Sequence, residues 1–124
     1  MGQTGDVFFD RYFEELGRRL RDAAPADLER LGVMFGDTQT RGRKVLLAGN
    51  GASAAIASHV AVDLTKTAGI RAMTFNEADL ITCFANDYGY EHWIARAIAA
   101  YGDPGDVVVL ISSSGASPNV VNAA

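Results

Sequence analysis

The sequence predicts an α/β chain built around a small parallel sheet. Three short apolar runs, at residues 44–50, 70–76 and 107–113, alternate with stretches of helical periodicity. Runs of this kind are typical of strands buried on both faces, and strands separated by helices pair in parallel through right-handed crossovers. We therefore expect a three-layer α-β-α arrangement that follows a pair of N-terminal helices.

The N-terminal helical pair is expected over residues 1–42, which we treat as a unit separate from residues 43–124. Bulky apolar side chains recur at three- and four-residue steps over residues 6–23, and Pro25 suits the first turn of a second helix. The apolar residues of the two helices are Phe9, Tyr12, Phe13, Leu16, Leu20, Leu28, Leu31, Met34 and Phe35. Such stripes can cover a sheet or form a subunit interface, and the pattern does not choose between these roles.

Helices are also expected between the strands. The first should bury Ile56, Val60 and Leu64 and end near Gly69. Between the second and third strands we expect a short helix, a turn at residues 86–89 and a helix over residues 91–100. A further helix should begin near Pro118, and because only barely two turns of it are present, the sequence reads as a domain truncated after its third strand.

Composition excludes several classes of protein. The chain has 124 residues, a net charge of −4 and a single cysteine, Cys83, which rules out an internal disulfide or a cysteine-rich zinc site. The only basic cluster is at residues 41–44, so nucleic acid is not expected as a ligand. No signal peptide or run of about 20 apolar residues is present, so we expect a cytoplasmic protein without a membrane partner.

A serine-rich loop follows the third strand. Ser112, Ser113, Ser114 and Ser117 lie within six positions, with Gly115 among them and Pro118 after them. Ser117 is a suitable helix N-cap, and unpaired amides together with hydroxyls at a strand-to-helix junction can hold the oxygens of a phosphate. The alternative is a capped turn whose serines are incidental.

A second strand-to-helix junction has the sequence GNGAS at residues 49–53, with Ser53 as a candidate N-cap. Together with Ala54 it fits the dinucleotide pattern G-x-G-x-x-A, although that pattern alone is weak. On the helix that follows, His59 and Asp63 are four residues apart and share one face. They can be a base and its partner, two metal ligands, or a surface pair without function.

Four segments together resemble the sugar isomerase (SIS) domain: GNGAS at 49–53, SHVAVDL at 58–64, CFANDYGYE at 83–91 and ISSSGASPN at 111–119. They stand in the order and at the separations that the family shows. The third segment is most similar to the phosphoheptose isomerase branch. The resemblance implies a flavodoxin-like or Rossmann-like SIS fold and the conversion of sedoheptulose 7-phosphate into D-glycero-D-manno-heptose 7-phosphate, a step toward lipopolysaccharide and other bacterial surface sugars.

The resemblance also implies roles for individual residues. It makes Ser112, Ser113, Ser114 and Ser117 the phosphate-binding residues, and Asn50, Gly51, Ser53, Asn86 and Asp87 the residues that line the sugar side. Asp63 stands where the family has a glutamate that acts as base and metal ligand, and His59 matches a histidine that can ligate zinc. The implied chemistry is proton transfer through an enediolate, with zinc as the candidate cofactor and no nucleotide cofactor.

The resemblance implies a homo-oligomer, a dimer or tetramer assembled through the N-terminal helices, and active-site residues beyond Ala124. Two departures stand out: Asp63 is one methylene shorter than glutamate, and Ala52 replaces a glycine. A misplacement of roughly 1 Å can cost about a hundredfold in rate. The alternatives to a phosphosugar isomerase are a non-catalytic member of the branch that binds a replication initiator or another partner, and a nucleotide-binding Rossmann module.

Overall fold

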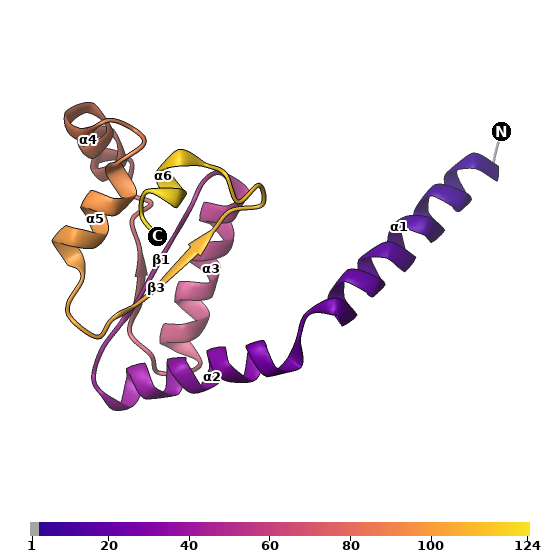
Figure 1. Ribbon diagram of the computed structural model, residues 1–124, viewed down its shortest axis with the longest axis horizontal. Helices are drawn as coiled ribbons and strands as arrows, with labels where there is room; N and C mark the ends of the chain where they lie inside the picture. Colours follow the sequence, from indigo (N-terminus) through magenta and orange to yellow (C-terminus); the bar gives the residue numbers. More distant parts are fainter. Residues whose placement is uncertain (1–2) are drawn as a thin grey trace. The chain divides into compact units, whose positions relative to one another are not determined.

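The computed structural model describes residues 3–124 and shows an alternation of helices and strands (Figure 1). The elements are α1 (Gln3–Asp22), α2 (Pro25–Thr40), β1 (Val45–Gly49), α3 (Ala52–Lys66), β2 (Ala72–Thr74), α4 (Ala78–Tyr88), α5 (Trp93–Tyr101), β3 (Val107–Ile111) and α6 (Pro118–Val121). The chain divides within α2 into two compact units, one ending at Val33 and one spanning Met34–Ala124. In the part of the chain described, no helix combines the length and apolar character that a membrane crossing requires.

The three strands form one parallel sheet in the order β2-β1-β3. Strand β1 is in the centre: Val45 is paired with Ala72 on one side and with Val107 on the other. The pairing with β3 continues to Gly49 and Ile111, whereas the pairing with β2 ends at Leu47 and Thr74. The predicted parallel sheet is confirmed.

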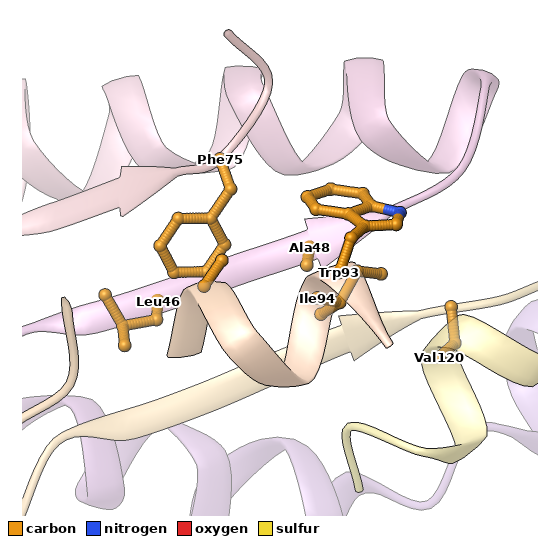
Figure 2. Close-up of a cluster of buried hydrophobic side chains, with 7 residues drawn as sticks. Leu46, Ala48, Phe75, Trp93, Ile94 and Val120 are labelled. Atoms are coloured by element: carbon orange, nitrogen blue, oxygen red, sulfur yellow. The ribbon is translucent and has the colours of Figure 1, made fainter. Parts of the chain in front are cut away.

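Strand β1 is buried throughout its length because each face of the sheet is covered. Successive side chains of a strand point to opposite faces, so Val45 and Leu47 enter one apolar cluster while Leu46 and Ala48 enter another. Figure 2 shows the second cluster, in which the rings of Phe75 and Trp93 gather with Leu46 and Ala48, and Val120 joins from α6. A continuous apolar run is therefore what this strand requires.

Helices cover both faces, which confirms the three-layer arrangement. Helix α3 packs against the sheet through Ala57 and Ala61, and Phe35 near the end of α2 joins the same cluster. The other face is covered by α4, α5 and α6, whose buried residues include Trp93, Ile94 and Val120 (Figure 1). The end of α2 thus acts as a cover for the sheet, one of the two roles open to the helical pair.

Several details differ from the sequence prediction. Strand β2 has three residues instead of the seven of the apolar run, and Asn86, Asp87 and Tyr88 form the last turn of α4 instead of a turn between helices. Ile56 is 53% exposed, because the small side chains of Ala57 and Ala61 face the sheet and let α3 approach it closely. The apolar residues of α3 therefore identified a helix but only part of its buried face.

A buried ion pair ties the start of β1 to the turn before β3. The Lys44 ammonium lies 2.6 Å from carboxylate oxygens of both Asp106 and Asp103, and the Asp106 side chain is 4% exposed. Asp106 also accepts hydrogen bonds from the backbone amides of Lys44 and Asp103. Burial raises the pKa of Asp106, but the hydrogen bonds from Lys44 and the two amides outweigh it and lower the pKa to about 2.

Replacement of Asp106 by asparagine should destabilise the fold at neutral pH by about 2 kcal/mol, because the buried charge that pairs with Lys44 is lost and an NH2 group replaces one of the two acceptor oxygens. The folded pKa lies below the ordinary value of 3.8, so the stabilisation is complete above that value and is lost as the pH falls toward about 2. Urea denaturation between pH 2 and pH 7 should show a weaker pH dependence in the variant. Asp27→Asn, at an exposed pair with Arg30, is the control, and equal stability of the two variants would contradict the prediction.

The glycine that ends β1, Gly49, is required by close packing. A Cβ atom on Gly49 would lie 2.8 Å from the Ser53 Cβ and 2.9 Å from the Ile111 carbonyl oxygen, which is backbone and cannot move aside. We expect Gly49→Ala to cost about 1–3 kcal/mol of folding free energy. Gly36→Ala in α2, where nothing lies within 4 Å, should instead stabilise by about 0.5–1 kcal/mol. Urea midpoints that move in the same direction in both variants would contradict this account.

Candidate functional site

Two loops lie side by side at the carboxyl edge of the sheet. Because Gly49 pairs with Ile111, the chain leaves β1 and β3 at the same level, and the loop after each strand begins there. One loop contains Asn50 and Gly51, and the other is the serine loop, residues 112–117. In parallel α/β sheets this edge is where ligands bind. The structure thus brings together the two strand-to-helix junctions that the sequence singled out.

The serine loop is held by its own hydroxyls. The amide of Gly115 donates to Ser112 Oγ at 3.1 Å, the amide of Ala116 donates to Ser114 Oγ at 3.2 Å, and the two hydroxyl oxygens are 3.4 Å apart. Gly115 has φ of +65°, a conformation that favours glycine. A hydroxyl that accepts from an amide still has its own proton to donate. The hydrogen bond between the two oxygens uses one of the two hydroxyl protons, so this pair keeps one proton for a ligand, and Ser113 and Ser114 are exposed.

Helix α6 begins at Pro118, as predicted, with Ser117 in the N-cap position. The Ser117 side chain, however, makes no capping hydrogen bond; its backbone carbonyl instead accepts from the amides of Val120 and Val121 at 2.9 Å. The expected hydroxyl cap is therefore wrong. Because α6 has only four residues, its dipole contributes little, and the donors of this loop are its hydroxyls and amides.

The loop after β1 turns sharply into α3. Gly51 occupies the N-cap position with φ of +54° and ψ of −121°, and it makes no side-chain cap. Ser53 lies inside α3, where its amide donates to the Asn50 carbonyl oxygen at 3.0 Å. The prediction that Ser53 caps the helix is wrong. Gly51 adopts a backbone conformation that favours glycine, and the N-cap therefore lies two residues earlier in the sequence than predicted.

The side chain of Asn50 is the point where three segments meet. It exchanges two hydrogen bonds with Asn119 of α6, at 2.9 and 2.8 Å, and its Oδ1 also accepts from the Tyr90 hydroxyl at 3.2 Å. Asn119 and Tyr90 were not among the predicted site residues. The sequence signal was slight, since one asparagine and one tyrosine 29 residues apart give no spacing that singles them out.

Asn86 and Asp87 lie exposed in the last turn of α4. The Asn86 amide donates to Asp87 Oδ1 at 2.9 Å, and the Cys83 thiol lies 3.9 Å from Asp87 Oδ2. Within the described residues neither side chain bonds to the serine loop or to Asn50. Their segment reaches the two loops through Tyr90, which follows Gly89 at the end of α4.

His59 and Asp63 occupy the exposed face of α3. His59 Nε2 lies 3.5 Å from Asp63 Oδ2, with side chains 80% and 62% exposed. Over residues 3–124 no group of three or more histidine, cysteine, aspartate or glutamate side chains is placed to hold a metal ion. Catalytic zinc takes three protein ligands and structural zinc four, so this pair alone does not fit a zinc site. Neither residue bonds to the serine loop among the described contacts.

Comparison with known proteins identifies relatives of this chain. The chain is 42% identical over 113 residues to the phosphoheptose isomerase of Rhodospirillum rubrum, a match covering 85% of this chain and 58% of that protein. It is 36% identical to the phosphoheptose isomerase of Proteus mirabilis, covering 89% of this chain and 60% of that protein. The solved structure of phosphoheptose isomerase GmhA from Neisseria gonorrhoeae superposes with a TM-score of 0.87 at 30% identity, covering 97% of this chain and 67% of that one.

The chain thus spans somewhat more than half the length of the curated relatives that it matches. A family model described as the SIS domain matches residues 8–124, which includes both loops and all three strands. The order of strands, the serine loop and this match lead to one conclusion: the chain belongs to the SIS domain family.

Proposed function

We propose that this protein is a phosphosugar aldose–ketose isomerase that converts sedoheptulose 7-phosphate into D-glycero-D-manno-heptose 7-phosphate. The observation that carries the proposal is the serine loop placed beside the loop after β1, in a chain 42% identical to a phosphoheptose isomerase. A phosphosugar has a charged end and a polyhydroxylated end, and two adjacent polar loops match these two ends. The family match favours this function over dinucleotide binding. A dinucleotide site would also leave the serine loop without a role.

In the proposed complex the serine loop binds the phosphate and the other loops bind the sugar. Hydroxyl and amide donors suit phosphate oxygens, and hydrogen bonds to a charged group are stronger than those between neutral groups. The phosphate ligands are Ser112, Ser113, Ser114 and Ser117; the sugar ligands are Asn50, Gly51, Ser53, Asn86 and Asp87. The exposure of Ser113 and Ser114 supports this assignment.

The proposed reaction needs a base, and Asp63 is our candidate. The base removes a proton from C1 of the ketose, the C1–H electrons form a C1–C2 double bond, and the carbonyl oxygen at C2 becomes an enediolate oxygen. The proton then returns to C2 as the C1 carbonyl forms, and the C1 hydroxyl proton passes to the C2 oxygen, which gives the aldose with no net oxidation. Asp63 is exposed, and none of the described contacts joins it to the serine loop.

Zinc stays a prediction. His59 and Asp63 would supply two of its ligands, and additional ligands would have to come from elsewhere in the protein or from another copy. A bound zinc ion would supply a positive charge near the developing enediolate. We also propose that the protein acts in the cytoplasm, in the synthesis of bacterial surface sugars, as its single cysteine is compatible with a reducing compartment.

Replacement of Ser114 by alanine should weaken the binding of sedoheptulose 7-phosphate by roughly tenfold or more, because one hydrogen bond to a charged phosphate is lost. The Ala116 amide also loses its partner in this variant. Titration calorimetry with the sugar phosphate, compared with NAD, measures the effect directly. Thermal shift with and without zinc tests the metal in the same samples.

Thr40→Ala is a matched control, since this hydroxyl bonds only to Gly36 within α2, which leads to the opposite end of β1. Equal affinity of the two variants would count against the phosphate role of the loop. Asp63→Asn should abolish turnover of the heptose phosphate with little change in affinity, which separates catalysis from binding. Tight binding of NAD without any response to sugar phosphates would overturn the proposed function.

We further propose that the protein is a homo-oligomer assembled through α1. Large apolar side chains of this helix are exposed, among them Phe8 at 62%, Phe9 at 56% and Phe13 at 62%. The rings of Phe9 and Phe13 lie 6.4 Å apart, as do those of Phe8 and Tyr12, so the aromatic residues form one continuous face. An apolar face of this size on a helix supports a protein interface, and a second copy is its simplest partner.

Phe13→Glu should reduce the oligomer to smaller species, because it introduces a charge into the apolar face of α1. Sedimentation velocity at a series of protein concentrations measures the change. Arg11→Glu introduces the same side chain two positions earlier, beside Phe8 and Tyr12 but on the side of the helix away from Phe13, and should weaken the assembly less than Phe13→Glu does. A wild-type protein that is monomeric, with α1 bound to a different protein, would favour the non-catalytic alternative.

A further inference from the structure

Two side-chain amides join the loop after β1 to the helix after β3. Asn50 Nδ2 donates to Asn119 Oδ1 at 2.9 Å, and Asn119 Nδ2 donates to Asn50 Oδ1 at 2.8 Å. The two residues are 69 positions apart in the sequence, so the pair exists only because β1 and β3 are neighbours. A reciprocal pair of this kind fixes the orientation of both side chains at once.

Asn119 is 2% exposed and packs beside Val120 of the apolar cluster. A buried side-chain amide without hydrogen-bond partners destabilises a protein by about 1–3 kcal/mol, because it loses its hydrogen bonds to water. An apolar residue would avoid this cost at the position of Asn119. In the structure, Oδ1 and Nδ2 of Asn119 both form hydrogen bonds with Asn50. Its position is also linked to the serine loop, since the Ser117 carbonyl closes the first turn of the same helix.

Tyr90 adds a third segment to the pair. Its hydroxyl donates to Asn50 Oδ1 at 3.2 Å, and its ring lies 6.4 Å from that of Trp93, which is 2% exposed and belongs to the core. Asn50 Oδ1 therefore accepts two hydrogen bonds from the protein, while Nδ2 uses one of its two N–H groups. Among the contacts of the described residues, one N–H of Asn50 is left for a ligand, and the pairing with Asn119 determines its direction.

We propose that Asn119 is a positioning residue: by pairing with Asn50 it holds the loop after β1 in a fixed relation to the serine loop, so that the two ends of one phosphosugar are bound together. This inference rests on the proposed function for the nature of the ligand. It assigns to Asn119 no contact with the ligand. The role is instead to make the phosphate-binding loop and the sugar-binding loop act as one site.

The first test is ligand-free. Asn119→Ala should increase the hydrogen-exchange rates of the amides of Ser53 and Ala55, whose hydrogen bonds end on Asn50 and Gly51. Asn122→Ala is the matched control, because it removes an asparagine of the same helix segment that bonds to the Glu91 carbonyl and not to Asn50. Unchanged exchange at residues 50–55 in Asn119→Ala would overturn the proposal, whatever ligand the protein binds.

The second test is a double-mutant cycle on the affinity for sedoheptulose 7-phosphate, with Asn50→Ala, Asn119→Ala and the double variant. We expect each single variant to weaken binding by roughly tenfold, and the double variant to be about as weak as either one, because the two side chains act as a unit. Inorganic phosphate, which needs only the serine loop, should lose affinity by less than about threefold. A residue that only stabilised the fold would lower Tm and leave both affinities unchanged well below Tm.

The outcomes separate the two proposals. Faster exchange at the loop together with the non-additive loss of sugar phosphate binding supports the positioning role. Additive effects, or equal losses for sugar phosphate and inorganic phosphate, would overturn it. A wild-type protein that binds no sugar phosphate would overturn the proposed function, and with it the effect of Asn119 on phosphosugar binding. The exchange measurement would still decide whether Asn119 couples the two loops.

Discussion

Strand β1 is the constraint on which the rest of the structure depends. It is the central strand of the sheet and is buried on both faces. Its side chains alternate between the two apolar clusters, one on each face of the sheet. The register with β3 runs the full length of both strands and ends at Gly49 and Ile111. A shift of one residue would exchange the faces of every side chain and separate the two loops that begin at this edge.

The two ends of β1 serve different purposes. At its start Lys44, Asp103 and Asp106 form a charged cluster that ties the strand to the turn before β3. At its other end, Gly49 allows the backbone of β1 to lie close to the Ile111 carbonyl oxygen of β3 and to Ser53. The two loops with their polar groups begin at this end. The ion pair therefore lies at the end of β1 away from the candidate site, and the register of β1 with β3 determines where the two loops begin.

The candidate site divides into a part that is assembled and a part that is not. Asn50 and Asn119 are joined by two hydrogen bonds over the neighbouring ends of β1 and β3, and the serine loop beside them is held by its own hydroxyls. His59 and Asp63, by contrast, stand exposed on α3 without a third ligand or a contact to the serine loop among the described residues. Phosphate binding is therefore the better supported half of the proposal.

The sequence by itself determined the class of fold, because apolar runs, helical periodicity and the glycine and proline positions are local properties that act on neighbouring residues. It also identified both strand-to-helix loops and, through its resemblance to the SIS domain, the family. Only the tertiary structure decided that Ser53 does not cap α3, that Asn86 and Asp87 are helical, and that Asn50 pairs with Asn119 and Tyr90. The contacts of Asn50 join segments far apart in the chain, which sheet register and burial bring together and which no local pattern encodes.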